Sequence, residues 1–213
     1  MIVLGIDAAL TACSAAVLVD GVVRAEAEAG DGRSYATRLP DMVREVLAGA
    51  LPDLVAVTVG PGSFTGLRAS IALAQGVALG AGCPAVAVSV AEALAEEVGA
   101  ALPLWVALDS RRGRIFLDRG AGMEAVTLEA VAAPAGRVAL AGDAAAALAA
   151  RLRELGAEIV ETDVVRPRAR AVAAAGGRRA VGALPPLALR PLYVDPPQAA
   201  LPKGGLRPAP QPA

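Results

Sequence analysis

The chain has 213 residues, a formal net charge of −1 and no histidine, and 55% of its residues are hydrophobic. This length supports one large domain or two small lobes with their own cores, and a mean hydropathy of +0.54 excludes disorder over most of the chain. The balanced charge argues against a broad basic surface for nucleic acid, because non-specific binding requires many phosphates to be neutralised. The lack of histidine excludes histidine-based zinc sites and the Ser-His-Asp and Cys-His catalytic systems.

No apolar run approaches the roughly 18 residues that a membrane-spanning helix needs. Met1 leads directly into a strand-like run with no positively charged segment before it, so we expect no secretory signal and a soluble, cytoplasmic protein. Cys13 and Cys83 lie in apolar surroundings without the spacing of metal ligands. We therefore expect two buried thiols, no metal and no cofactor.

The first part of the chain predicts an antiparallel meander followed by alternating helices and strands. Asp20-Gly21 is typical of a two-residue hairpin turn, in which both central residues need positive φ. Three such strands followed by helical crossovers predict a mixed α/β sheet covered by helices. The expected elements are strands over 2–7, 13–19 and 22–28, a helix from Ser34 as N-cap to Ala50, a strand over 54–59, a helix over about 65–80, a strand over 85–88 and a helix over 90–98 capped by Ser89.

The second part predicts a smaller lobe. A hairpin joins expected strands over 104–108 and 115–118, and a strand over 138–141 leads to a helix from Asp143, as N-cap, to Leu155. Periodicity is weak after Gly176. We expect a first lobe over 1–101, a second lobe over 102–190 and a proline-rich tail over 191–213 that wraps a surface or is disordered.

A glycine-rich turn separates the strand that ends at Val59 from the helix that follows. Its glycines permit positive φ and a close approach of the backbone to a ligand, and a hydroxyl could cap the helix, whose N-terminus favours anions. The same residues would also make a tight corner that packs one element on another without a ligand. The residues of this possible anion-binding turn are Gly60, Gly62, Ser63, Thr65 and Gly66.

Four segments resemble one family, the bacterial tRNA threonylcarbamoyladenosine biosynthesis protein TsaB. They are GIDAALTACSAAVLVDG, GPGSFTGLRASIALAQGVALG, WVALDSRRGRIFL and RPLYVDP. The resemblance implies the two-lobed actin-like, sugar-kinase-like fold, with a βββαβα mixed sheet in the first lobe. It also implies a non-catalytic subunit that binds the catalytic paralogue TsaD and, in a larger complex, the ATPase TsaE with ATP. That complex transfers threonylcarbamoyl to N6 of adenosine 37 in tRNAs that read ANN codons, so this chain would meet tRNA indirectly.

The residues support the idea that this relative has lost a nucleotide site. Kinases of this fold bind phosphate with a glycine-bearing turn after the aspartate of the first strand, whereas here Asp7 precedes Ala8-Ala9-Leu10-Thr11, whose side chains hinder that approach. Asp7 could hold Mg²⁺ through water or bond nearby backbone donors. The catalytic paralogue holds its metal with histidines, which this chain lacks.

The resemblance also implies a partner surface on the two helices at about 34–50 and 65–80. Small residues such as Ala69, Ala72 and Gly76 would permit close helix approach, and a homodimer through the same helices is plausible when the partner is absent. The alternative is that the apolar residues face their own sheet. The candidates for this partner interface are Leu39, Met42, Val43, Val46, Leu67, Ile71 and Ala74.

Two further hypotheses remain open. Arg111, Arg112 and Arg114 form a local basic cluster that could contact RNA or a partner, or simply be a solvated hairpin tip. The chain could instead be a small-molecule kinase or ATPase of the same fold that uses Asp7, Ser63 and Thr65.

Overall fold

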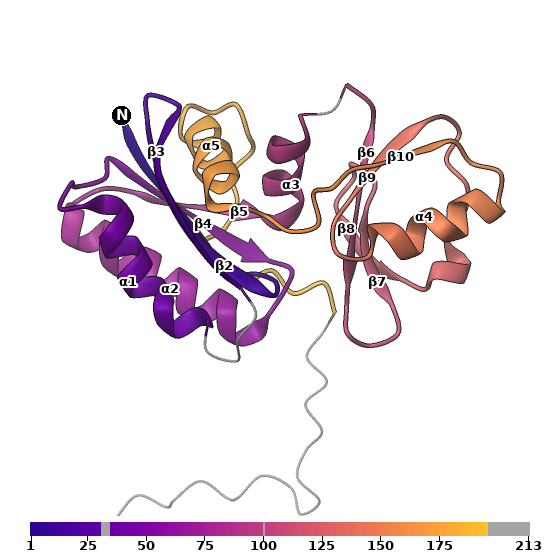
Figure 1. Ribbon diagram of the computed structural model, residues 1–213, viewed down its shortest axis with the longest axis horizontal. Coiled ribbons are helices and arrows are strands. Elements are labelled where there is room, and N and C mark those ends of the chain that lie inside the picture. Colours follow the sequence, from indigo (N-terminus) through magenta and orange to yellow (C-terminus); the bar gives the residue numbers. More distant parts are fainter. Residues whose placement is uncertain (31–34, 100, 196–213) are drawn as a thin grey trace, which may run out of the picture.

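The computed structural model describes residues 1–30, 35–99 and 101–195, with residues 35 and 36 described by their backbone alone. The predictions for Ser34 and for tail residues 196–213 lie outside the described residues. The chain forms two lobes, each built around a five-stranded sheet (Figure 1).

The first sheet has the strand order β3-β2-β1-β4-β5, in which β1, β2 and β3 are antiparallel neighbours and β4 and β5 run parallel to β1. Asp20 and Gly21 have φ values of 51° and 80°, which confirms the predicted hairpin turn. Ser89 is the N-cap of α3, as predicted, and the structure adds a capping box with Glu92. The elements are β1 (Ile2–Asp7), β2 (Ala12–Val19), β3 (Val22–Gly30), α1 (Tyr35–Leu47), β4 (Leu54–Gly60), α2 (Phe64–Ala81), β5 (Ala85–Ser89) and α3 (Val90–Val98).

The second sheet repeats the same topology in a shorter form. Its order is β10-β9-β6-β7-β8, with an antiparallel meander of β6, β7 and β8 and with β9 and β10 parallel to β6. The predicted hairpin between β6 and β7 is confirmed, whereas β8, β10 and α5 were not predicted. The elements are β6 (Leu104–Asp109), β7 (Ile115–Asp118), β8 (Met123–Val126), the 3₁₀ turn η1 (Leu128–Ala130), β9 (Val138–Ala141), α4 (Ala145–Glu154), β10 (Ile159–Glu161) and α5 (Ala169–Ala180).

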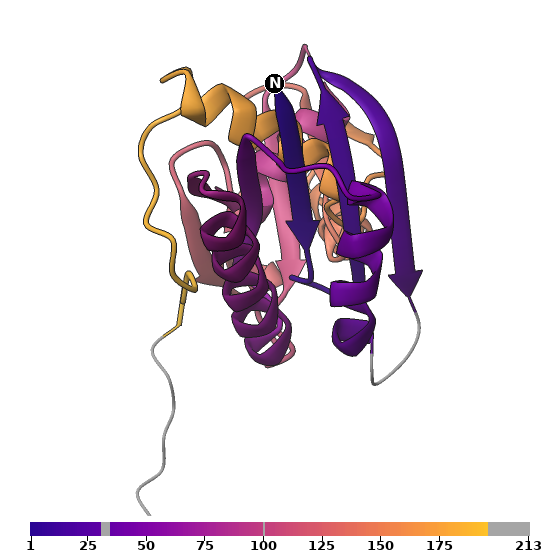
Figure 2. The ribbon, with the colours of Figure 1, turned by 90° about the vertical axis from the view of Figure 1, so that its left-hand side faces the viewer.

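The helix α5 corrects the expected division of the chain, which placed residues 102–190 in the second lobe. It returns to the first lobe and packs on β1, β2 and β4, on the face opposite α1 and α2 (Figures 1 and 2). Two glycines allow the close packing: a Cβ on Gly5 would lie 2.0 Å from the carbonyl oxygen of Ala169, and one on Gly176 would lie 2.3 Å from the Cβ of Ala56. The physical reason is that β1 and β4 are buried on both faces, so a second layer must cover them.

The two lobes share an apolar contact. Val90 and Leu94 of α3 are fully buried against the second sheet, where Leu108 is 1% exposed. This cluster buries the face of the second sheet that α4 leaves free, because α4 packs with the other cluster of that lobe. The lobes are therefore joined by packing as well as by the chain. The complete cluster consists of Ala9, Leu67, Val90, Leu94, Val106, Leu108 and Ala141.

Within the part of the chain that the structure describes, no helix combines the length and the apolar character needed to cross a membrane.

Candidate functional site: an interlobe cleft and the exposed face of α2

The glycine turn is a packed corner between β4 and α2. A Cβ on Gly62 would lie 2.0 Å from the carbonyl oxygen of Ala9, and one on Gly66 would lie 2.1 Å from that of Ala8. Gly60 has a φ of 111°, which favours glycine. The loop after β1 therefore occupies the space that the glycines leave open.

Two N–H groups that a phosphate cradle would use at this corner already have partners within the chain. Ser63 donates its backbone N–H to the carbonyl oxygen of Ala9 at 2.6 Å, and the Ser63 hydroxyl accepts the N–H of Gly66 at 3.2 Å. Ser63 is thus the N-cap of α2, while Thr65 is exposed. The geometry favours the corner over the phosphate cradle, because two of the donors that would hold an anion are used to fix the loop.

Asp7, at the end of β1, is 2% exposed and accepts hydrogen bonds from residues beside the glycine turn. Its Oδ1 accepts the Thr58 hydroxyl at 2.6 Å and the Ala9 N–H at 3.2 Å. Burial raises the pKa of Asp7 from its ordinary 3.8 to about 7. Across the described residues, no cluster of three or more His, Cys, Asp or Glu side chains is arranged to hold a metal ion.

A cleft of about 580 Å³ lies between the lobes. Phe64 and Ser63 line it from the first lobe, and Phe116, Arg111 and Arg112 line it from the second. The charge of one of these arginines is balanced by carboxylates, because Arg111 pairs with Asp109 and Asp143 at 3.2 Å each. Asp143 was predicted to cap α4, but its Oδ1 instead accepts the N–H of Asp109, and Ala144 occupies the N-cap position.

The predicted basic cluster is therefore only partly available. Arg114 pairs with Asp195 at 2.6 Å, and Arg111 is held at a φ of 61° by its N–H bond to Asp109. Arg112 is exposed and has no carboxylate partner among the described residues. Of the three arginines, Arg112 is the one whose charge is not balanced by a carboxylate of the described residues.

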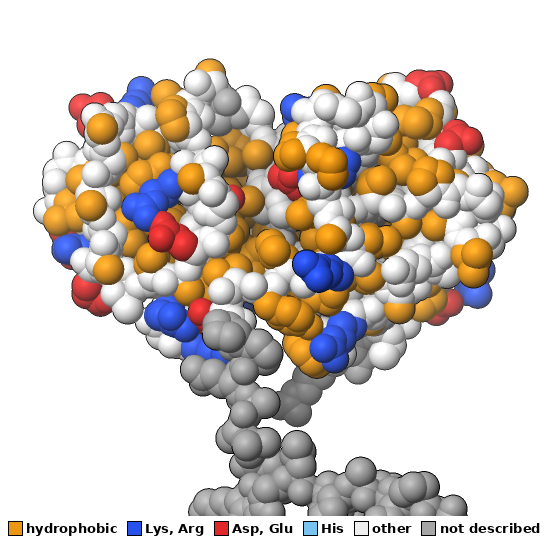
Figure 3. Space-filling model, turned by 180° about the vertical axis from the view of Figure 1, so that it is seen from behind, with side chains coloured by type: hydrophobic (Ala, Val, Ile, Leu, Met, Phe, Trp, Pro, Cys, Tyr) orange, Lys and Arg blue, Asp and Glu red, His pale blue; other side chains and the backbone are white. Residues whose placement is uncertain are grey.

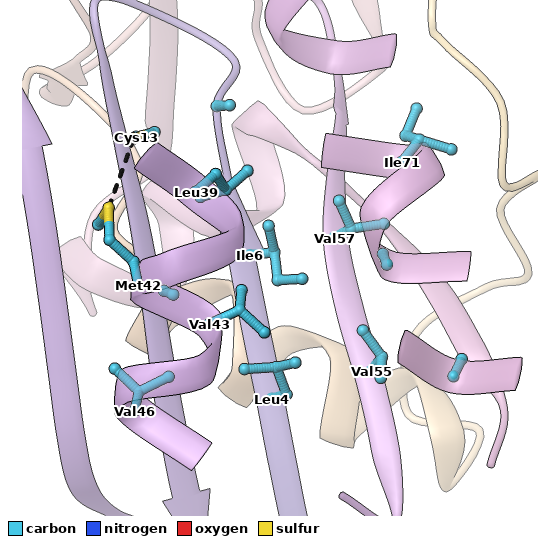
Figure 4. Close-up of a cluster of buried hydrophobic side chains, with 14 of the residues drawn as sticks. Leu4, Ile6, Cys13, Leu39, Met42, Val43, Val46, Val55, Val57 and Ile71 are labelled. Atoms are coloured by element: carbon cyan, nitrogen blue, oxygen red, sulfur yellow. Dashed lines mark hydrogen bonds between the residues drawn. The ribbon is translucent and has the colours of Figure 1, made fainter. Parts of the chain in front are cut away.

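The seven residues expected at a partner interface face the chain's own core, which corrects that assignment. Each is at most 6% exposed. Figure 4 shows the α1 members and Ile71 pointing toward the strands of the first sheet. Their spacing is that of an amphipathic helix packed on a sheet. The apolar periodicity therefore identifies residues of the core and not residues of a partner interface. They are Leu39, Met42, Val43, Val46, Leu67, Ile71 and Ala74.

The opposite face of α2 carries the unexpected apolar surface. Leu79 is 85% exposed, and Ala72, Gly76 and Gly80 are exposed on the same side. A Cβ on Gly76 would meet nothing within 4 Å. We call Ala72, Gly76, Leu79 and Gly80 the α2 face. Sequence reasoning noted Ala72 and Gly76 but missed Leu79. A signal was available, since α2 is apolar around much of its circumference and such a helix is normally buried.

A second feature that sequence reasoning missed lies at the start of α2. The segment after α5 returns past β4, where Leu192 donates its N–H to the Val59 carbonyl oxygen at 2.7 Å. It brings the Tyr193 ring to 6.3 Å from the Phe64 ring, between centroids. Arg68 stacks on Phe64 at 3.6 Å from the ring centroid and donates to the Tyr193 hydroxyl at 3.2 Å. The bond between Arg68 and Tyr193 joins residues 125 positions apart, so no local pattern predicts this group of side chains.

The topology and the paired lobes define a two-lobed α/β protein of the actin-like and sugar-kinase-like class. The sequence model of the family described as TsaD: tRNA N6-adenosine threonylcarbamoyltransferase matches residues 31–154. The chain therefore belongs to this family.

Individual relatives agree with this assignment. The chain is 38% identical to the tRNA threonylcarbamoyladenosine biosynthesis protein TsaB of Escherichia coli (strain K12), over 54% of this chain and 53% of that protein. It is 32% identical to the protein of the same name from Haemophilus influenzae, over 54% and 52%. The chain thus spans about half the length of the curated relatives it matches. The structure of YeaZ from Pseudomonas aeruginosa superposes with a TM-score of 0.73 at 27% identity, covering 90% of this chain and 99% of that one.

Proposed function

We propose that this chain is a non-catalytic scaffold subunit in the synthesis of threonylcarbamoyladenosine in tRNA. In this role it binds a catalytic subunit of the TsaD type in the cytoplasm, in a larger complex that also contains TsaE and ATP. The catalytic subunit transfers threonylcarbamoyl to N6 of adenosine 37 in tRNAs that decode ANN codons. The similarity to relatives named TsaB supports a role in threonylcarbamoyladenosine synthesis. The match to the TsaD family model supports a chain that shares the fold of the catalytic subunit.

The single observation that carries the scaffold role is the filled phosphate corner. Ala8 and Ala9 pack against Gly66 and Gly62, and the Ala9 carbonyl oxygen takes the Ser63 N–H that a phosphate would need. This arrangement argues against the alternative function, a small-molecule kinase or ATPase of the same fold. Asp7 is buried and bonded to Thr58, so it is not placed to hold a metal ion in the cleft.

The partner surface that fits this role is the α2 face. An exposed, nearly uncharged helix face with small residues allows another helix to approach closely, and Leu79, at 85% exposed, offers an apolar side chain for that helix to bury. The seven buried residues predicted earlier would support this face from beneath by holding α1 and α2 on the sheet. When the catalytic subunit is absent, the same face could pair two copies of this chain.

Charge placed on the α2 face is expected to weaken the complex. Leu79→Glu and Ala72→Glu would bury an unpaired carboxylate at the contact, so we expect the dissociation constant for the TsaD-type subunit to rise at least about tenfold. Light scattering and titration calorimetry with the purified partner measure this, and thermal unfolding of the free variants should be unchanged because both side chains are exposed.

Val181→Glu is the matched control, because Val181 is 75% exposed at the end of α5, on the opposite side of the first sheet. Complexes as tight as the unsubstituted one for Leu79→Glu and Ala72→Glu would refute this surface. Binding of Mg²⁺-ATP to the isolated chain in the same calorimeter would favour the kinase alternative.

A further inference from the structure

We propose that the residues around the mouth of the interlobe cleft bind single-stranded RNA directly. The site consists of Phe64 and Tyr193 as stacking rings and of Arg68, Arg112 and Arg190 as cations. We call these five residues the stacking patch. The inference rests on the proposed function only for the choice of RNA over DNA.

The aromatic rings are the first observation. Only 2% of the residues in this chain are aromatic, and large aromatic side chains are normally buried because they carry much apolar area. Phe64 is 55% exposed and Tyr193 is 49% exposed, and their rings lie together although the two residues are far apart in the sequence. The Arg68 guanidinium on Phe64 extends the stack with a third planar group. Nucleic-acid bases stack on such rings and guanidinium planes.

The charges around the rings are the second observation. Arg68, Arg112 and Arg190 are exposed and have no carboxylate partner among the described residues, whereas the neighbouring Arg111 and Arg114 are paired with aspartates. Arg190 lies two residues before Leu192, which is bonded to β4 beside the glycine corner. Arginine side chains flank hydrophobic ones near the base of the groove between the lobes (Figure 3).

The exposed rings and the unpaired arginines together indicate a single-stranded nucleic acid as the ligand. A protein hot spot would also use aromatic and arginine side chains, but several unpaired cations beside two exposed rings are complementary to a ligand that is a polyanion and carries planar bases. The rings are accessible only to unpaired bases, because bases in a duplex stack on each other. The two surfaces adjoin on α2, because Ala72 lies one turn after Arg68, whereas Leu79 lies about 22 Å from Phe64 at the usual rise per residue. An RNA loop at Phe64 and a protein partner at Leu79 would therefore bind side by side.

The test is fluorescence anisotropy with a labelled single-stranded RNA of about ten nucleotides. We expect binding that weakens with salt, with a slope of log K against log salt of about −2 for three arginines. A duplex of the same length should bind more weakly. The double variant Phe64→Ala/Tyr193→Ala should lose about 5- to 150-fold in affinity, and Arg112→Ala should lose affinity and flatten the salt slope.

Two matched controls make the result specific. Arg137→Ala removes an equally unpaired, exposed arginine from the second lobe, and Leu51→Ala removes an exposed apolar side chain; neither should change binding. Absence of RNA binding at low salt, or equal losses in the controls and in the stacking-patch variants, overturns the proposal. If the double variant binds the TsaD-type subunit more weakly while the unsubstituted chain binds no RNA, the patch is a protein contact instead.

The same preparations separate this inference from the scaffold role. Loss of RNA binding with an intact complex supports both proposals. RNA binding by a chain that forms no complex supports the stacking patch and refutes the scaffold.

Discussion

Gly62→Ala is expected to lower the free energy of unfolding by about 3 kcal/mol or more. The added Cβ would lie 2.0 Å from the Ala9 carbonyl oxygen, and this atom belongs to backbone that cannot rotate away. Moving the loop would also break the 2.6 Å bond between the Ser63 N–H and that oxygen. Urea unfolding of the purified variant, followed by circular dichroism, measures the loss.

Gly76→Ala is the matched control for this change, since its Cβ meets nothing within 4 Å and alanine favours an exposed helix by up to about 1 kcal/mol. The pair also decides between the two interpretations of the glycine turn. A phosphate cradle would need Gly62 for ligand approach, so the variant would fold normally and lose only anion binding. A Gly62→Ala protein as stable as the unsubstituted chain would contradict the packed corner.

The second large effect is expected at Asp7, whose burial raises its pKa to about 7. In the unfolded chain this carboxyl titrates near its ordinary value of 3.8, so between these two values the folded state holds more protons than the unfolded state. The contribution of Asp7 to the free energy of unfolding is therefore fully present below about pH 4 and is lost as the pH rises through 7. The loss has an upper bound of about 4 kcal/mol for a shift of this size.

Asp7→Asn should remove this dependence. Asparagine keeps an oxygen that can accept the bonds from Thr58 and Ala9, but it does not titrate. We expect the variant to gain stability relative to the unsubstituted chain as the pH rises from 4 to 8. Denaturant unfolding across this range gives the difference directly, with Asp41→Asn on the exposed side of α1 as a control. Parallel stability curves for the unsubstituted chain and Asp7→Asn would refute the buried, protonated carboxyl.

Local patterns predicted much of this fold because many of its elements carry their own signals. The Asp20-Gly21 turn, the Ser89 N-cap and the strands of the first sheet follow from turn chemistry, capping and apolar runs. The helix α5 was missed because it is rich in alanine, glycine and arginine, and because its position depends on contacts with Gly5 and Ala56 far along the chain.

The candidate site was harder to predict for a related reason. Apolar periodicity on α1 and α2 identifies the buried stripe, so it selected residues such as Val43 and Ile71, which face the sheet. The exposed Leu79 has no periodic signal of its own, because it lies on a helix whose other faces are also apolar. The pairing of Phe64 with Tyr193 depends on the return of the chain after α5, and sequence spacing carries no information about that return.

The scaffold role is tested most directly by reconstituting threonylcarbamoyl transfer from purified components. Transfer to adenosine 37 of an ANN-decoding tRNA is measured with the TsaD-type subunit, TsaE and ATP, with and without this chain. The scaffold role predicts that transfer requires this chain up to a stoichiometric amount, that Leu79→Glu supports transfer only at a higher concentration, and that the chain alone transfers nothing. Full transfer in the absence of this chain, or transfer by this chain on its own, would contradict it.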